Sequence, residues 1–107
     1  MLDFYLLIPC YNNVEGLIRS LRSVVYPKEK CKVLIVDDGS LTPVTIELLP
    51  ADILQQLQIE IIRLNGNKGI TEALNTGLRL ILQRNDALYT ARLDCGCLLY
   101  TSDAADE

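Results

Sequence analysis

Adjacent carboxylates at Asp37 and Asp38 are the clearest chemical signal in the sequence. An ionised aspartate only accepts hydrogen bonds, so a pair held at the end of a strand suits the N–H of a nucleobase and the hydroxyls of a ribose. The same residue types are equally typical of a simple turn, with Asp37 capping a bend at Asp38-Gly39. The pair is therefore a candidate nucleotide contact, with a plain turn as the alternative.

Two further residues are suited to phosphate groups. Lys68 lies in a glycine-flanked loop, where its ammonium could approach a phosphate or pair with a carboxylate; the alternative is a lysine that only faces solvent. Asp94 could hold Mg²⁺ or Mn²⁺ against the oxygens of a diphosphate, because these cations prefer hard oxygen ligands. One carboxylate is weak evidence for a metal, so the position of Asp94 in the fold has to support it.

Alternating strand-like and helix-like segments must position these side chains. Apolar, β-branched runs predict four strands, at Phe4–Ile8 (closed by Pro9), Lys32–Val36, Ile59–Leu64 and Ala87–Leu93. Helical spacing predicts a helix from Asn12 or Asn13 to Pro27, in which Glu15 completes a capping box from Asn12 and the apolar positions include Val24 and Val25. It also predicts a short helix from Thr42-Pro43 to Leu49, a piece around Ile53–Leu57, and a long helix with its apolar stripe on Ile70, Ala73, Leu74, Gly77, Leu78, Ile81 and Leu82.

This order of elements predicts the α/β class, with an open, mostly parallel, Rossmann-like sheet. Such sheets bind ligands outside the carboxyl ends of their strands. Four polar segments each follow a predicted strand: Tyr11-Asn12, Asp37-Asp38, Asn67-Lys68 and Asp94. Each alone is an ordinary turn, but their convergence on one rim favours a binding site.

Composition limits the classes of protein to which the chain can belong. Half of the 107 residues are apolar, and no uninterrupted apolar run approaches the roughly 20 residues that span a bilayer. No basic cluster suggests nucleic acid, and no basic, apolar leader precedes the first strand. We therefore expect no membrane span, no nucleic-acid partner, and a cytoplasmic location, including the periphery of the inner membrane face. The four cysteines, without any histidine, are expected to be reduced thiols.

The last eleven residues, 97–107, break the pattern. Cys97–Glu107 has no amphipathic period, and it resembles an in-frame translation of the transposase adapter used in sequencing libraries. We expect it to be an artefactual tail, the alternative being a native acidic tail. Without its three acids the net charge falls from −4 to −1, so the acidity would say nothing about partners. Residues 1–96 would then be the N-terminal part of a longer protein.

Four motifs, in this order, resemble the family 2 glycosyltransferases of the GT-A fold. They are Ile8-Pro9-Cys10-Tyr11-Asn12-Asn13-Val14-Glu15, Val36-Asp37-Asp38-Gly39-Ser40, Asn67-Lys68-Gly69 with Asn75-Thr76-Gly77, and Ala91-Arg92-Leu93-Asp94. The resemblance covers residues 4–96. It implies an inverting, metal-assisted transferase that uses a nucleotide-sugar donor of UDP or dTDP type, with a glycan or lipid-linked acceptor.

The resemblance also implies roles for individual residues. Pro9, Tyr11, Asn12 and Glu15 would line the nucleotide pocket, Asp37 and Asp38 would contact base and ribose, and Asn67 and Lys68 would lie nearby. Asp94 would be the first acid of a DxD-like metal motif and bind Mn²⁺ or Mg²⁺. The second acid of that motif is absent from Asp94-Cys95-Gly96-Cys97, and the family's general base lies further along, so no catalytic residue is assigned and we expect the chain alone to be inactive.

Other functions fit the pattern less well. A receiver-like signalling domain carries its acidic pair after the first strand and its phosphorylated aspartate after the third, where this chain has Asn65. A dinucleotide-binding module would show a Gly-x-Gly-x-x-Gly turn after the first strand, and a nucleotidyltransferase a Gly- and Arg-rich loop there. A non-catalytic nucleotide-binding α/β module remains open.

Overall fold

A computed structural model describes residues 1–96 of the chain, so the predicted tail, Cys97–Glu107, lies outside the described residues. The strands are β1 (Leu2–Cys10), β2 (Cys31–Asp37), β3 (Gln58–Arg63) and β4 (Ala87–Arg92). The helices are α1 (Val14–Arg22), α2 (Ala51–Gln56) and α3 (Ile70–Arg84), with short 3₁₀ turns at Lys28–Lys30 and Ile46–Leu48. Strands and helices alternate as the sequence predicts.

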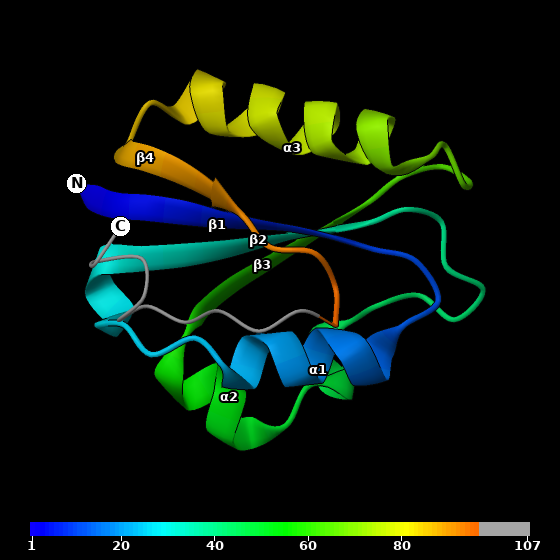
Figure 1. The fold of residues 1–107 in the computed structure, drawn as a ribbon, viewed down its shortest axis with the longest axis horizontal. Helices are drawn as coiled ribbons and strands as arrows, with labels where there is room; N and C mark the ends of the chain where they lie inside the picture. Colours follow the sequence, from blue (N-terminus) through cyan, green and yellow to red (C-terminus); the bar gives the residue numbers. More distant parts are fainter. Residues whose placement is uncertain (97–107) are drawn as a thin grey trace.

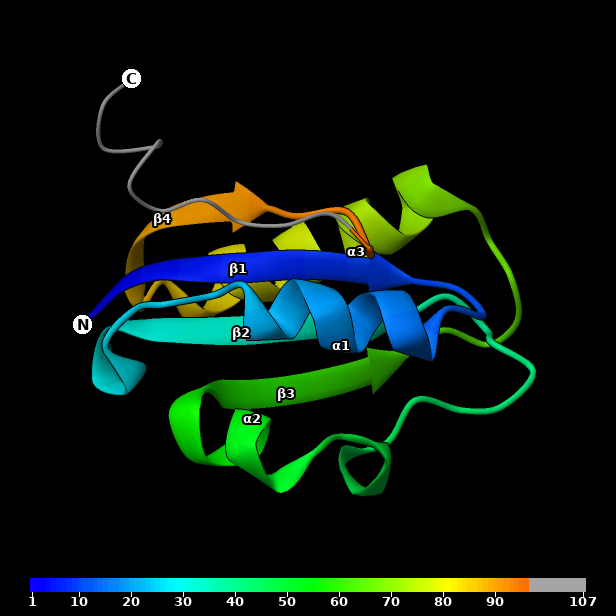
Figure 2. The same cartoon turned by 60° about the horizontal axis from the view of Figure 1, so that its bottom comes forward.

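The four strands form one parallel sheet in the order β3-β2-β1-β4 (Figure 2). The predicted α/β class with an open, parallel, Rossmann-like sheet is therefore confirmed. The order 3-2-1-4 is that of the dinucleotide-binding type of doubly wound sheet, whereas receiver-like domains place the first strand between the second and third. The receiver-like alternative is therefore wrong on topology.

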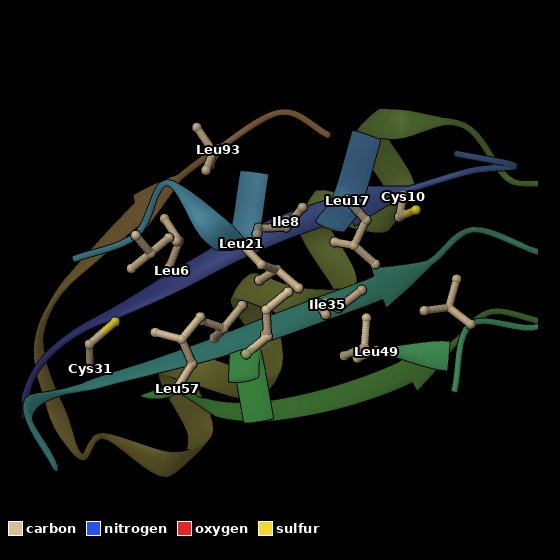
Figure 3. Close-up of a cluster of buried hydrophobic side chains, with 14 residues drawn as sticks. Leu6, Ile8, Cys10, Leu17, Leu21, Cys31, Ile35, Leu49, Leu57 and Leu93 are labelled. Atoms are coloured by element: carbon tan, nitrogen blue, oxygen red, sulfur yellow. The ribbon is translucent and has the colours of Figure 1, made fainter. Parts of the chain in front are cut away.

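Helices cover both faces of the sheet. Helix α3 lies on one face, and α1 and α2 lie on the other (Figure 1). The two central strands alternate between these layers: Leu6 and Ile8 of β1 join the core under α1 and α2, and Tyr5 and Leu7 join the core under α3. Figure 3 shows the first of these cores, in which Leu17 and Leu21 of α1 pack on β1 and β2. Burial on both faces explains why β1 and β2 read as continuous apolar runs.

Strand β1 continues past the predicted stop at Pro9. Pro9 pairs with Val36 of β2, and the strand ends only at Cys10. In a parallel sheet, the backbone groups of successive residues form hydrogen bonds alternately with the strand on one side and the strand on the other. Leu7 accepts a hydrogen bond from Leu93, on the β4 side. Pro9 therefore faces the side where β4 has already ended, so no partner needs the N–H that proline lacks.

Helix α1 begins at one of the two caps that the sequence predicts, but it ends earlier than predicted. Its cap is Asn13, whose Oδ1 accepts from the backbone N–H of Gly16, so the predicted capping box from Asn12 to Glu15 is wrong. The helix ends at Arg22, well before Pro27. Beyond it, the Ser23 hydroxyl donates to the carbonyl of Ser20, a local bond that competes with helix continuation.

The predicted helix from Thr42 to Leu49 is also wrong, because only the 3₁₀ turn at Ile46–Leu48 forms there. Thr45 has an extended backbone, with φ −129° and ψ 162°, which breaks a helix begun at Thr42. The Oδ2 of Asp37 accepts a 3.0 Å hydrogen bond from the backbone N–H of Val44, which ties the segment to the end of β2. The segment is thus held as a loop over the end of β2.

Helix α3 has a narrower contact face than its sequence predicts. Ala73, Gly77 and Ile81 are buried, four residues apart, whereas Leu78 and Leu82 are 38% and 75% exposed. A Cβ on Gly77 would overlap Leu7 and lie 3.2 Å from a methyl carbon of Val36. Glycine therefore lets the helix backbone approach the sheet, which turns Leu78 and Leu82 outwards.

Candidate functional site

Asp37, the last residue of β2, lies fully buried. Its carboxylate accepts hydrogen bonds from the backbone N–H groups of Ser40 and Val44, both at 3.0 Å, and from the guanidinium of Arg63 at 2.6 Å. Burial alone would raise the pKa of Asp37, but the bonds from Val44, Ser40 and Arg63 outweigh it and lower the pKa. Asp37 is therefore a charged anchor for the loop that follows β2.

Asp38 reaches a different loop. Its Oδ1 accepts a 2.7 Å hydrogen bond from the backbone N–H of Lys68, and its Oδ2 accepts from Gly69 at 2.9 Å and from the amide of Asn67 at 3.1 Å. The carboxylate thus shapes the loop between β3 and α3. The two adjacent aspartates therefore bind different loops: Asp37 binds the loop after β2, and Asp38 binds the loop after β3.

Gly39 allows these two loops to touch. It has a φ of +73°, and a Cβ at this position would overlap the carbonyl carbon of Gly66 and lie 2.6 Å from the nitrogen of Asn67. Any other residue would therefore have to adopt a strained backbone conformation, and its side chain would also push the two loops apart.

The loop after β1 is tied to the same assembly. The backbone N–H of Asn12 donates to the hydroxyl of Ser40 at 2.8 Å, and Oδ1 of Asn12 accepts from the backbone N–H of Leu41 at 2.8 Å. Asn12 adopts a φ of +51°, which asparagine tolerates better than most residues. Three loops at the carboxyl ends of β1, β2 and β3 therefore form one hydrogen-bonded rim.

A cleft opens in this rim. It has a volume of about 260 Å³ and is lined by Pro9, Cys10, Tyr11, Asp38, Asn67, Gly69 and Ile70. Tyr11 is 47% exposed, so an aromatic side chain is accessible at the cleft. A second hollow of about 400 Å³ contains Asn12 and Glu15, together with Asn13, Val14, Leu41 and Thr42.

The predicted site residues divide between these places. Pro9, Tyr11, Asp38 and Asn67 share the first cleft, and Asn12 and Glu15 share the second. Asp37 lies beneath the rim and is fully buried. Lys68 lines neither hollow, although its backbone is fixed by Asp38.

Asp94 follows β4, as predicted. Its carboxylate is half-exposed and pairs with the guanidinium of Arg92 at 2.9 Å, and its carbonyl accepts from the hydroxyl of Ser20. Across residues 1–96, no three histidine, cysteine, aspartate or glutamate side chains form a group that could hold a metal ion. Asp94, the carboxylate that the sequence suggests for a cation, thus already has a cationic partner in Arg92.

Next to Asp94, the sulfur of Cys95 lies 3.5 Å from that of Cys10 at the end of β1. The hydrogen bond from Cys95 lowers the pKa of Cys10. These thiols connect the segment after β4 to the rim.

Sequence reasoning missed Arg63 and Ser40. Arg63 binds Asp37 and also donates to the carbonyl of Ser40 at 2.9 Å, so it helps to close the loop after β2. A signal was present, because Arg63 and Asp37 end neighbouring strands and are directly paired in the register. Opposite charges at such positions attract across a sheet.

A family model described as glycosyl transferase family 2 matches residues 5–99. The chain belongs to glycosyl transferase family 2. The resemblance seen in the motifs is thereby confirmed. No curated protein sequence matches the chain significantly.

Three solved structures illustrate the similarity of fold. The crystal structure of S. aureus TarS 1–349 has a TM-score of 0.76 at 21% identity, covering 98% of this chain and 31% of that one. The complex of TarS 1–349 with UDP-GlcNAc has a TM-score of 0.71 at 22% identity, covering 98% of this chain and 30% of that one. The mannosyltransferase PcManGT from Pyrobaculum calidifontis, in complex with GDP-Man and Mn²⁺, has a TM-score of 0.58 at 25% identity. The match covers 73% of this chain and 24% of that one. The chain thus spans about a third of the length of TarS 1–349.

Within the described residues, no helix is long and apolar enough to cross a membrane.

Proposed function

We propose that residues 1–96 are the donor-binding part of a glycosyltransferase that takes its sugar from a nucleotide diphosphate, and that Cys97–Glu107 is an artefactual tail. The observation that supports this most is the cleft shared by Pro9, Tyr11, Asp38 and Asn67 at the carboxyl ends of the strands. In an open α/β sheet this edge is where ligands bind. Membership of glycosyl transferase family 2 makes a nucleotide sugar the ligand class that we propose.

In this proposal Tyr11 stacks on the base and Asp38 accepts from it or from the ribose. Each carboxylate oxygen can accept two hydrogen bonds, and Oδ1 of Asp38 accepts only one, from Lys68, among the described residues. Capacity for a ligand N–H or hydroxyl therefore remains. Asp37 acts through the loop that it anchors, because it is fully enclosed. Asn12 and Glu15 line the second hollow of the rim, into which the donor, of UDP or dTDP type, would extend.

Asp94 is the residue we propose for a divalent cation, Mn²⁺ or Mg²⁺. Such cations are commonly held by one or two carboxylates together with the phosphates of a substrate. One carboxylate is therefore enough for a site that the bound diphosphate completes, but not for a site formed by residues 1–96 alone. Binding would require Asp94 to leave Arg92. When bound, the cation would stabilise the negative charge on the departing nucleotide diphosphate.

We further propose that transfer inverts the anomeric centre and goes to a glycan or lipid-linked acceptor, at the cytoplasmic face of a membrane or in the cytoplasm. Inversion by direct displacement needs a base to take the proton of the acceptor hydroxyl. We assign no residue to that step, and we expect the 107-residue chain to transfer no sugar by itself. Sugar transfer by the purified chain would contradict this expectation.

Calorimetric titration tests the proposal. UDP should bind the chain in the presence of Mn²⁺ and more weakly after the metal is chelated, whereas NAD should not bind. Asp94→Asn should abolish the effect of the metal while leaving the weaker, metal-free binding. Asp52→Asn is the matched control, because Asp52 is an exposed acid paired with Arg22 on the helical surface. Equal binding of UDP and NAD, or no UDP binding, would overturn the proposal.

A further inference from the structure

The thiols of Cys10 and Cys95 are in direct contact although 85 positions separate them in the chain. Their sulfur atoms lie 3.5 Å apart, and both are within hydrogen-bond distance of the carbonyl of Asn13, at 3.7 Å for Cys10 and 3.2 Å for Cys95. A disulfide needs a sulfur separation of about 2.05 Å, so the two atoms would have to approach by roughly 1.5 Å. Small rotations of the two side chains can supply a movement of this size.

Backbone hydrogen bonds hold the two cysteines in this position from both sides. Leu93 donates to the carbonyl of Leu7, and Gly96 donates to the carbonyl of Gly16 at 3.1 Å and to the hydroxyl of Ser20 at 2.8 Å. The turn that carries Cys95 is therefore fixed on both sides of the cysteine against β1 and α1. Cys10 is itself the last residue of a central strand, packed near Leu17 in the core (Figure 3).

We propose that Cys10 and Cys95 are a redox modification site that closes to an intramolecular disulfide on exposure to a peroxide and opens again with a thiol reductant. The structure assigns the order of attack through exposure. Cys95 is partly exposed, whereas Cys10 is 2% exposed, so the peroxide meets Cys95 first. The proposal does not depend on the nucleotide-sugar function.

The chemistry balances with the peroxide as the two-electron oxidant. The thiolate of Cys95 attacks one peroxide oxygen, the O–O bond breaks, and Cys95 becomes a sulfenic acid as hydroxide leaves. The thiolate of Cys10 then attacks the sulfur of Cys95, forming the S–S bond and expelling a second hydroxide. The two thiol protons convert both hydroxides to water.

Peptide mapping after peroxide treatment tests the site. Trypsin leaves Cys10 in the peptide Met1–Arg19 and leaves both Cys95 and Cys97 in Leu93–Glu107. We therefore use Cys97→Ser, in which Cys95 is the only cysteine of the second peptide. We expect these two peptides to become linked with the loss of two hydrogens, and a reductant to separate them.

Controls separate this pair from general oxidation. Cys31 is buried and burial raises its pKa to about 11, so Cys31→Ser should link as fully as its parent. Cys10→Ser and Cys95→Ser should not give the linked peptides. In case a further serine variant fails to fold, the melting temperature of Cys97→Ser gives a second readout: it should rise on oxidation and fall back on reduction. Sulfinic acid at Cys95 with Cys10 still a thiol, or linkage through Cys31, would overturn the proposal.

Discussion

The carboxylate of Asp38 accepts a 2.7 Å hydrogen bond from the backbone N–H of Lys68, thirty positions further along the chain. This bond joins the loop after β2 to the loop after β3, and the neighbouring N–H of Gly69 binds the other oxygen of the same carboxylate. An acid that a motif would assign to a ligand therefore also builds the wall of the cleft. In the proposed function, nucleotide binding and stability are therefore coupled at this residue.

Asp38→Asn should lower both stability and nucleotide binding. An amide offers one uncharged acceptor oxygen where three donors converge, so at least one N–H group loses its hydrogen bond to a charged acceptor, at a cost of about 1–3 kcal/mol. Chemical denaturation measures the loss. Asp52→Asn, in an exposed ion pair with Arg22, should cost about 1 kcal/mol or less. Equal stabilities of the two variants would contradict the structural role of Asp38.

Gly39→Ala should be more damaging than Gly66→Ala. Both glycines have positive φ, +73° and +94°, so each substitution carries a backbone penalty of about 1–2 kcal/mol. Only at Gly39 would the added Cβ also meet the opposite loop, and we expect a total loss of about 3 kcal/mol or more there. Thermal unfolding of the two variants measures the difference. Similar melting temperatures would show that the loops are not in close contact.

Gly77→Ala should destabilise the chain by about 1–3 kcal/mol, because the new methyl group would overlap Leu7 of β1. Leu82→Ala removes a much larger side chain from the same helix but should change stability by only about 0.5 kcal/mol, since Leu82 is 75% exposed. Urea denaturation compares the two. A greater loss for Leu82→Ala would mean that α3 is rotated from the position described.

Glu60→Gln should destabilise the chain at neutral pH and much less in acid. Arg84 binds Glu60 through two hydrogen bonds of 2.6 and 2.7 Å, and these bonds lower the pKa of Glu60 below its ordinary value of 4.5. A depressed pKa means that the ionised form is stabilised by folding, so this contribution is present above about pH 4.5 and is lost as the pH falls through the lower, folded-state pKa.

Denaturation of the native chain and of Glu60→Gln at pH 7 and pH 3 measures this effect. The difference in unfolding free energy, about 1 kcal/mol at pH 7 for a partly exposed pair, should shrink towards zero at pH 3. A difference that stays constant or grows on acidification would contradict the sign of the shift.

The sheet could be predicted because its signals are local. Apolar runs such as Leu6–Ile8 and Val33–Val36 are buried on both faces, and helical patterns separate them. The gathering of Tyr11, Asp38 and Asn67 followed from a general property of parallel sheets, namely that strand ends share one edge.

What could not be predicted depends on contacts between distant residues. Asp37 binds the N–H of Val44 from the end of β2, so a contact that nothing near Thr42 signals holds the segment at Thr42–Val44 against the sheet. Adjacent Asp37 and Asp38 look alike in sequence, yet one is enclosed by Arg63 and the other turns to Lys68. Likewise, the exposure of Leu82 follows from the close approach of Gly77 to Leu7.

The most direct test of the central claim is to map UDP binding on the isotope-labelled chain by amide chemical shifts. We predict that Tyr11, Asp38, Asn67 and Gly69, which line the cleft, shift together as UDP is added. The groove lined by Val24, Val25, Tyr26 and Gln56, about 330 Å³ in volume, serves as the internal control and should not respond. Shifts confined to that groove, or no shifts at saturating UDP, would contradict the assignment of the rim as a nucleotide-binding site.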